Sequence, residues 1–137
     1  MNILIASNRP FPNRQAINPI VLDAWIKVTK PYAIFFPFWS WKVPNKILKK
    51  YKCIGFHTGA VAGGSPIQNL ILLGKEYASL NMFYMTDKLD KGKVICSDVV
   101  LLSGSLEEIV IRMTKVMEKM IKWYLNELKQ TKSKRKL

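Results

Sequence analysis

The sequence predicts an α/β fold, a mostly parallel β-sheet with helices packed on its faces. Short apolar segments alternate along the 137 residues with segments in which apolar residues recur at helical spacing. The last and longest helical segment opens with Ser105 to Glu108 (SLEE), a capping box that marks a helix start. We expect the first strands to run parallel and to be joined by right-handed crossovers.

The first third of the chain supplies two strands and one helix. Residues 1–6 (MNILIA) predict a short apolar strand, and residues 8–19, which contain three prolines, predict a loop. Residues 20–30 have apolar positions close to helical spacing, and Pro31 ends that helix. Residues 32–36 (YAIFF) predict a second, fully buried strand.

The middle of the chain repeats this alternation. Residues 37–41 form an aromatic loop, and residues 44–51 predict a short helix that begins at a proline. Residues 52–57 (KCIGFH) predict the third strand. After a run of small residues, Ser65 is placed to cap a helix over residues 66–73.

Two further strands precede the last helix. They cover residues 78–85 and 94–102, with a polar turn between them. We interpret residues 1–128 as one domain and residues 129–137 as a basic tail that we expect to be disordered. The last helix carries enough apolar surface to pair with a second copy, so a homodimer is one hypothesis.

The formal net charge of +13 is the strongest compositional feature. A basic surface attracts the phosphate groups of nucleotides, polyanionic cofactors or nucleic acid, and it also simply keeps a protein soluble. The lysines are scattered and no nucleic-acid-binding motif occurs, so nucleic acid ranks last among these partners.

Cysteine content and apolar runs restrict the class of protein. Apolar runs such as residues 32–36 are far shorter than the ~20 residues that span a bilayer, and no signal peptide precedes them. We therefore expect a cytoplasmic protein without a membrane partner. Cys53 and Cys96 lie in strand-like segments and are expected to be buried thiols. One histidine and two distant cysteines do not favour a metal site.

Three predicted loops meet beyond the carboxyl ends of the strands, where open α/β sheets bind ligands. His57 ends a strand and is either a general acid, base or oxyanion donor, or a core histidine bonded to the sheet. The loop with Phe38, Trp39 and Trp41 could stack on a flat heterocycle or cap the core. Asp90 is a turn former unless it pairs with His57.

Gly63, Gly64 and Ser65 precede the predicted start of a helix. Their backbone N–H groups could bind an anion, or the segment is a tight turn packed against the sheet. It is not a P-loop, because no Gly-Lys-Ser/Thr sequence follows.

The stretch CIGFHTGAVAGGSPIQNLILLGKE, followed by MTDKLDKGKVI, resembles the formyltransferases that use 10-formyltetrahydrofolate. In that family a strand ends in Asn-x-His, a loop leads to Arg-Gly-x-x-Pro-Ile, and a turn of the type Leu-Asp-x-Gly-x-Ile follows. The resemblance covers residues 31–128 and is greatest to the members that formylate amino sugars on nucleotide carriers. It implies a Rossmann-like, formyltransferase-like sheet that is truncated in its N-terminal half.

The resemblance also implies a reaction, in which a substrate amine attacks the formyl carbonyl. His57 matches the catalytic histidine, and Asp90 matches the aspartate that orients it. The acceptor would be a small-molecule amine such as a nucleotide-linked amino sugar, held with the help of Gly63, Gly64 and Ser65. The residues that would flank the pterin ring of the folate co-substrate are Phe38, Trp39, Met85, Thr86 and Leu89.

The sequence departs from the family pattern in three places. Gly55 stands where the family has asparagine, so one oxyanion donor is missing. The loop after His57 is shorter and lacks the family's arginine, and only one strand and one helix precede Tyr32. The alternative function is therefore a catalytically degenerate protein of the same fold that binds a nucleotide or a protein partner.

Overall fold

The structure is a computed structural model of the 137-residue chain. It describes residues 2–9, 11, 12, 14, 16–58, 70–87 and 92–136, with side chains up to residue 131.

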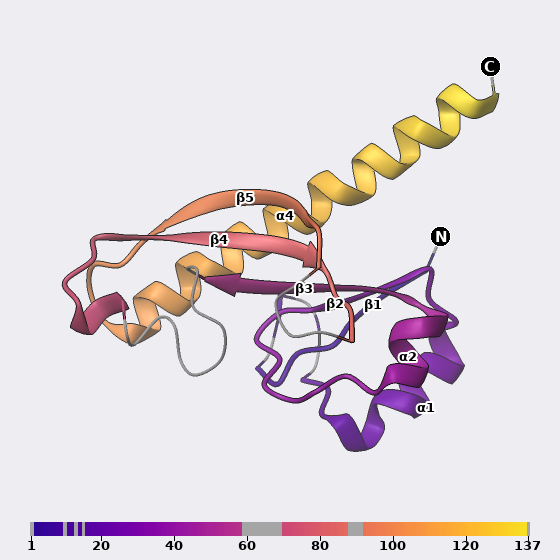
Figure 1. The fold of residues 1–137 in the computed structure, drawn as a ribbon, viewed down its shortest axis with the longest axis horizontal. Coiled ribbons are helices and arrows are strands. Elements are labelled where there is room, and N and C mark those ends of the chain that lie inside the picture. Colours follow the sequence, from indigo (N-terminus) through magenta and orange to yellow (C-terminus); the bar gives the residue numbers. More distant parts are fainter. Residues whose placement is uncertain are drawn as a thin grey trace.

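A five-stranded sheet in the order β1-β2-β3-β4-β5 forms the centre of the described chain (Figure 1). β1 pairs parallel with β2 and β2 with β3, whereas β4 is antiparallel to both β3 and β5. Four strands therefore share one direction, which confirms the predicted mostly parallel sheet. The strands are β1 (Ile3–Ile5), β2 (Ala33–Phe36), β3 (Lys52–Thr58), β4 (Tyr77–Tyr84) and β5 (Val94–Leu101).

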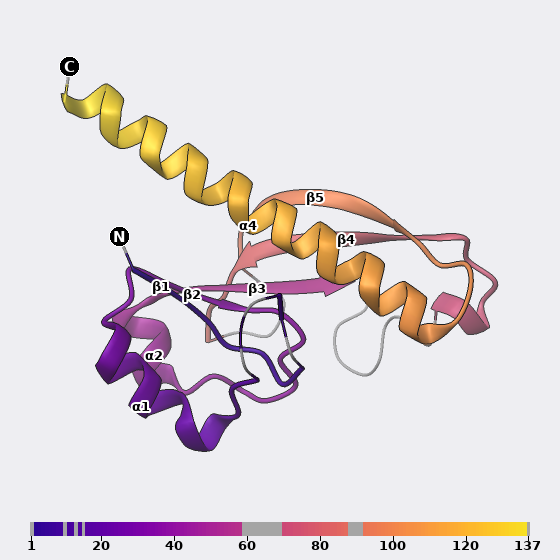
Figure 2. The ribbon, with the colours of Figure 1, turned by 180° about the vertical axis from the view of Figure 1, so that it is seen from behind.

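Helices cover both faces of this sheet, as Figures 1 and 2 show from opposite sides. α1 (Pro19–Thr29) and α2 (Asn45–Lys50) lie on one face, and α4 (Leu106–Lys136) lies on the other. Residues 70–72 add a helical turn within the helix predicted for residues 66–73. α1 begins where the Asn18 side chain accepts hydrogen bonds from two backbone N–H groups of its first turn.

The two faces bury separate clusters, because successive side chains of a strand point to opposite sides. Ile34 and Phe36 of β2 pack with α1 and α2, while Phe35 and Ala33 pack under α4. In β3, Ile54 is fully buried beneath α4, and Cys53 belongs to the opposite cluster. Gly55 and His57 alternate with these residues and therefore share the face of Cys53.

α4 starts at the predicted capping box. The Ser105 backbone N–H donates to Glu108 Oε1 at 3.1 Å, and the Glu108 backbone N–H donates to Ser105 Oγ at 3.2 Å. Hydrogen bonding of the Glu108 carboxylate to the backbone N–H and to the side chain of Ser105, with a smaller contribution from Arg112, holds the pKa of Glu108 below its usual value. The helix continues to Lys136, into the segment for which the sequence predicts a disordered tail. That segment lacks proline and glycine, and its basic residues suit a helix carboxyl end.

Both cysteines are free thiols. Cys53 is buried, and burial raises the pKa of its thiol to about 12. Cys96 is half-buried. The prediction of a buried thiol is therefore confirmed for Cys53 and only partly for Cys96. Among the residues that the structure describes, no group of three or more His, Cys, Asp or Glu side chains could hold a metal ion. Within the same residues, no helix is long and apolar enough to cross a membrane.

The packing beneath α4 predicts a matched pair of leucine substitutions. Leu80 of β4 is fully buried, whereas Leu72 is 85% exposed. We expect Leu80→Ala to lower the free energy of unfolding by about 2–5 kcal/mol, because it leaves a cavity. Leu72→Ala should change that free energy by less than about 0.5 kcal/mol. Urea unfolding measures both, and equal effects would contradict the placement of β4.

Candidate functional site

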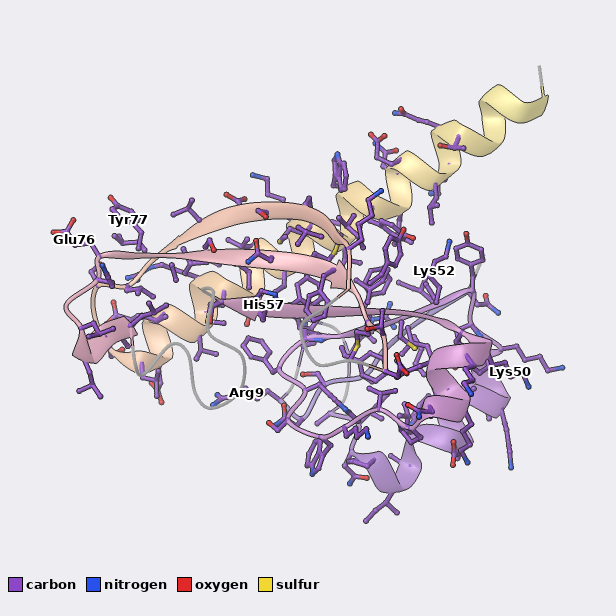
Figure 3. All side chains as sticks on the ribbon, viewed as in Figure 1. Arg9, Lys50, Lys52, His57, Glu76 and Tyr77 are labelled. Carbon is purple, nitrogen blue, oxygen red and sulfur yellow. The ribbon has the colours of Figure 1, made fainter. Side chains whose placement is uncertain are left out.

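The carboxyl ends of β1, β2 and β3 lie at one edge of the sheet, since these three strands are parallel. The loop after β1 begins at the buried Ser7 and brings out Arg9, and the loop after β2 carries Phe38 and Trp39. His57 is the next-to-last residue of β3. Figure 3 shows Arg9 and His57 between Tyr77 at one end of the molecule and Lys50 at the other.

His57 is half-buried on the sheet face opposite α4. Its ring lies against that of Phe83, with centroids 4.8 Å apart and the planes inclined by 50°. In the pairing of β3 with β4, His57 lies directly opposite Asn81. In the described part of the chain, no hydrogen bond fixes the imidazole, so its contact with Phe83 sets its position.

Gly55 leaves no open space where its side chain would be. A Cβ atom built there would lie 3.0 Å from Phe83 Cζ and 3.1 and 3.2 Å from Met85 Cγ and Sδ. Real Cβ contacts are rarely so short, so the Met85 and Phe83 side chains already fill the position. Neither side chain donates a hydrogen bond, and the site therefore has no amide donor at this position.

The loop after β2 holds Phe38 in a strained conformation. Its φ of +54° lies in the left-handed region, which residues other than glycine seldom adopt. The Arg9 guanidinium lies over the Phe38 ring, 5.8 Å from its centroid. A positive charge and an aromatic face thus meet at the carboxyl end of the sheet, and strain of this kind is concentrated at binding sites.

Trp39 is the centre of the aromatic cluster in the same loop. Its ring packs edge to face against Phe36 and against Trp41, with centroids 5.1 Å apart in each case. Trp39 also contacts the buried cluster under α1 and α2, so it does cap the core. Its Nε1 is buried, and no described residue accepts a hydrogen bond from it. A buried donor in this state is costly, and a bound molecule could supply the missing acceptor.

The turn after β4 folds back beside β3. The Met85 backbone N–H donates to the Cys53 carbonyl at 2.9 Å, and the Tyr84 N–H donates to the Lys93 carbonyl at 2.9 Å. Gly92 lies so close to the Tyr84 carbonyl that any Cβ atom would overlap it. The two ends of the turn are therefore held together, next to Gly55.

The structure tests the placement of only some predicted site residues. The His57 and Met85 side chains lie on the same face of β3. Phe38 and Trp39 lie in the loop after β2, and Thr86 is exposed in the turn after β4. The remaining predicted residues lie outside the described part of the chain; they are Gly63, Gly64, Ser65, Leu89 and Asp90.

Sequence reasoning missed two features of this region. Arg9 follows the first strand in the sequence Ser-Asn-Arg, a polar run directly after an apolar strand that could have indicated a site. Asn81 and Ser97 form the second feature: Ser97 Oγ donates to Asn81 Oδ1 at 2.5 Å beside His57. An asparagine inside a strand was the available signal, since strands disfavour it.

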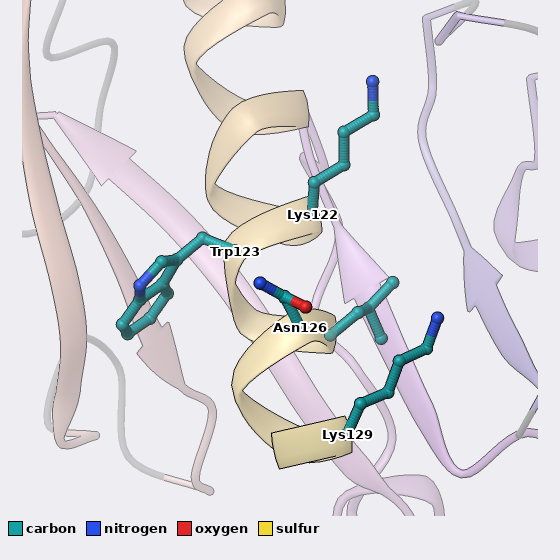
Figure 4. Close-up of a pocket in the computed structure, with 5 residues that line it drawn as sticks. Lys122, Trp123, Asn126 and Lys129 are labelled. Carbon is teal, nitrogen blue, oxygen red and sulfur yellow. The ribbon is translucent and has the colours of Figure 1, made fainter.

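A surface pocket of about 480 Å³ lies elsewhere, on α4 (Figure 4). All of its lining residues come from this one helix, so it is a groove along the helix surface rather than a cleft between elements. The residues are Lys122, Trp123, Leu125, Asn126 and Lys129. We place the candidate site at the carboxyl end of the sheet, where loops from separate strands meet.

Known formyltransferases match this chain in both sequence and structure. The chain is 41% identical over 58 residues to the methionyl-tRNA formyltransferase of Bacillus cereus, a match that covers 39% of this chain and 18% of the relative. A methionyl-tRNA formyltransferase structure from Clostridium thermocellum superposes with a TM-score of 0.82 at 28% identity, over 93% of this chain and 65% of that one. A phosphoribosylglycinamide formyltransferase structure from Campylobacter jejuni also matches, with a TM-score of 0.60 at 15% identity, over 76% of this chain and 60% of that one. No protein-family model matches the sequence.

Structures of lower sequence identity share the fold alone. HypX from Aquifex aeolicus in complex with tetrahydrofolic acid has a TM-score of 0.62 at 19% identity, over 87% of this chain and 27% of that one. A Mycobacterium tuberculosis structure described as a sugar N-formyltransferase has a TM-score of 0.66 at 14% identity, over 91% and 66% of the two chains. These matches confirm the predicted formyltransferase-like fold, while the chain spans less than two thirds of the Clostridium protein.

The filled position at Gly55 predicts a measurable coupling with Met85. Gly55→Asn should lower the free energy of unfolding by about 1–3 kcal/mol, because the new side chain overlaps Phe83 and Met85. In a Met85→Ala background the same substitution should cost at least about 0.5 kcal/mol less, since part of the space is vacated. Urea unfolding of the single and double variants measures this difference.

The matched control places Gly55→Asn in a Met113→Ala background, where a different methionine is removed, a buried residue of α4 on the other face of the sheet. In that background the losses in the free energy of unfolding caused by Gly55→Asn and by Met113→Ala should add. An undiminished cost of Gly55→Asn in the Met85→Ala background would show that Met85 does not occupy this position.

Proposed function

We propose that this chain takes part in formyl transfer from 10-formyltetrahydrofolate to an amine, with a nucleotide-linked amino sugar as the acceptor. The observation that carries the proposal is His57, half-buried near the carboxyl end of β3, one of three parallel strands that end at the same edge of the sheet. The formyltransferase relatives and the tetrahydrofolate-bound neighbour support this reaction class. The chain spans only part of its relatives, so its own activity is a proposal.

The described residues fit a folate. Its pterin ring is flat, polar at its edge and apolar on its faces, and it suits the Phe38 ring, the Met85 thioether and the aromatic cluster of Trp39. Trp39 Nε1, which has no acceptor among the described residues, is a buried donor for such a polar edge. Bound 10-formyltetrahydrofolate would supply a formyl group on nitrogen, the carbon that an amine can attack.

His57 would move the proton in this reaction. The acceptor nitrogen bonds to the formyl carbon, the bond from that carbon to the folate nitrogen breaks, and the proton lost by the amine reaches the departing nitrogen. An imidazole can both accept and donate that proton. Asp90 would orient the ring, as the resemblance implies. The Phe83 ring lies against the imidazole and helps to position it.

The basic character of the chain favours an acceptor that carries phosphate. The net charge is +13, and Arg9 stands at the carboxyl end of β1 with its guanidinium over the Phe38 ring. The names of the relatives and neighbours include acceptors of this kind, methionyl-tRNA and phosphoribosylglycinamide, as well as a sugar. The sequence motifs indicate a nucleotide-linked amino sugar, which we test first, and methionyl-tRNA is the main competing acceptor because the sequence match is to methionyl-tRNA formyltransferase.

A folate-independent binding protein of the same fold is the second candidate function. Gly55 favours it, because the structure provides no amide donor at that position and fills the space with Met85. Titration calorimetry separates the two functions. Binding of tetrahydrofolate supports formyl transfer, whereas binding of nucleotides without tetrahydrofolate supports the alternative.

The proposal predicts that His57 and Asp90 are required for product formation. We expect the purified protein to convert 10-formyltetrahydrofolate and a nucleotide-linked amino sugar to tetrahydrofolate and the N-formyl sugar, measured by mass spectrometry. His57→Ala should lower kcat by about 10²–10⁴-fold, because the proton transfer loses its catalyst. Asp90→Asn should lower kcat as well, while Asp87→Asn, an exposed carboxylate in the same turn, should leave it unchanged.

Methionyl-tRNA and phosphoribosylglycinamide are the competing acceptors in the same assay. Formyl transfer to either one would show that the proposed acceptor is wrong and would still support formyl transfer as the reaction. Absence of transfer to all three amines, together with absence of tetrahydrofolate binding by a folded protein, would refute formyl transfer.

A further inference from the structure

We propose that Asn81 is a catalytic residue of the formyl transfer, in which its side-chain N–H donates a hydrogen bond to the formyl oxygen as that oxygen becomes negatively charged. The inference rests on the proposed function and deepens it, since it names the group that stabilises charge beside His57. It starts from a cross-strand pair that nothing in the sequence motif indicates.

Asn81 and His57 form a directly opposed pair in the β3–β4 ladder. Opposed residues of antiparallel strands have Cβ atoms about 4.5–5.5 Å apart and point to the same face. Both residues are half-buried on the face opposite α4, so both are accessible without being fully solvated. An amide donor and an imidazole therefore stand side by side at the carboxyl end of β3.

Ser97 of β5 fixes the orientation of the Asn81 amide. Its hydroxyl donates to Asn81 Oδ1 at 2.5 Å, so the carbonyl side of the amide is directed toward β5. The NH₂ group has two N–H donors. In the described residues its single contact is to Ser79 Oγ at 3.5 Å, the outer limit for a hydrogen bond. Ser97 thus holds the amide in place, and within the described residues at least one of its two N–H donors has no partner.

The other described side chains on this face beside His57 do not supply this donor. Gly55 lies on the same face but has no side chain, and the Phe83 ring and Met85 thioether fill its space. Neither of those side chains donates a hydrogen bond of useful strength. Asparagine is also disfavoured inside a strand, and Asn81 stands between the buried residues Leu80 and Met82. Its presence is explained if its amide has a use on the open face.

The chemistry requires such a donor. When the amine nitrogen bonds to the formyl carbon, the π electrons of the carbonyl move to its oxygen, which becomes negative. An N–H directed at that oxygen stabilises the charge, and side-chain amides of asparagine serve in this way in acyl transfer. The electron pair then returns to form the carbonyl as the bond to the folate nitrogen breaks, and His57 passes the amine proton to that nitrogen.

Steady-state kinetics of Asn81→Ala test the assignment with 10-formyltetrahydrofolate and whichever acceptor the wild-type protein formylates. Loss of one oxyanion donor lowers kcat by about 10²–10³-fold, with KM values and tetrahydrofolate affinity unchanged. Asn81→Asp should lose at least as much, because a carboxylate accepts hydrogen bonds but does not donate them. Ser97→Ala should cause a smaller fall in kcat, since the amide remains but is no longer held.

Controls separate catalysis from folding. Asn126→Ala removes an exposed asparagine on α4 and should leave kcat unchanged. Asn81→Leu, of similar shape without donors, replaces Asn81→Ala if the latter does not fold, and thermal unfolding checks each variant. If a folded Asn81→Ala protein kept its full kcat, or if only its KM or its melting temperature changed, the assignment of Asn81 would be wrong and the proposed function would be unaffected. An inactive wild-type protein would overturn this assignment, and an inactive wild-type protein that also fails to bind tetrahydrofolate would overturn the proposed function as well.

Discussion

The site depends on the pairing of β3 with parallel β2 on one side and antiparallel β4 on the other. Ile54, fully buried under α4, fixes which residues of β3 face that helix. Gly55 and His57 then point to the opposite face. A shift of one residue in this register would turn His57 into the core beneath α4 and remove it from the open face. The hydrophobic packing of β3 against α4 thus determines that His57 lies on the opposite face of the sheet.

Local patterns were enough to predict the elements of the fold. The apolar run of residues 32–36, the helical spacing of residues 20–30 and the capping box at Ser105 each placed an element close to its observed bounds. Alternation does not reveal the direction of a strand, so the antiparallel β4 was not predicted. The basic tail was expected to be irregular, although its lysines and arginine are good helix formers and α4 continues through them.

The candidate site was harder to predict, because it depends on contacts between distant residues. His57 stood out as the single histidine at a strand end. Its neighbours did not: Asn81 is opposite it only through the β3–β4 register, and Arg9 meets Phe38 only because β1 and β2 end at one edge. The sequence showed that Gly55 replaces an expected asparagine. The structure adds that Met85 takes the space, and it places a different amide beside the histidine.

The central claim is that a reduced folate binds at the carboxyl end of the sheet with its formyl-bearing nitrogen beside His57. A crystal structure of the protein with tetrahydrofolate tests this most directly. We expect the pterin ring against Phe38 and Met85, and the nitrogen that carries the formyl group within reach of His57 and Asn81. Tetrahydrofolate bound instead along the α4 groove, or a site left empty at saturating ligand, would contradict the account.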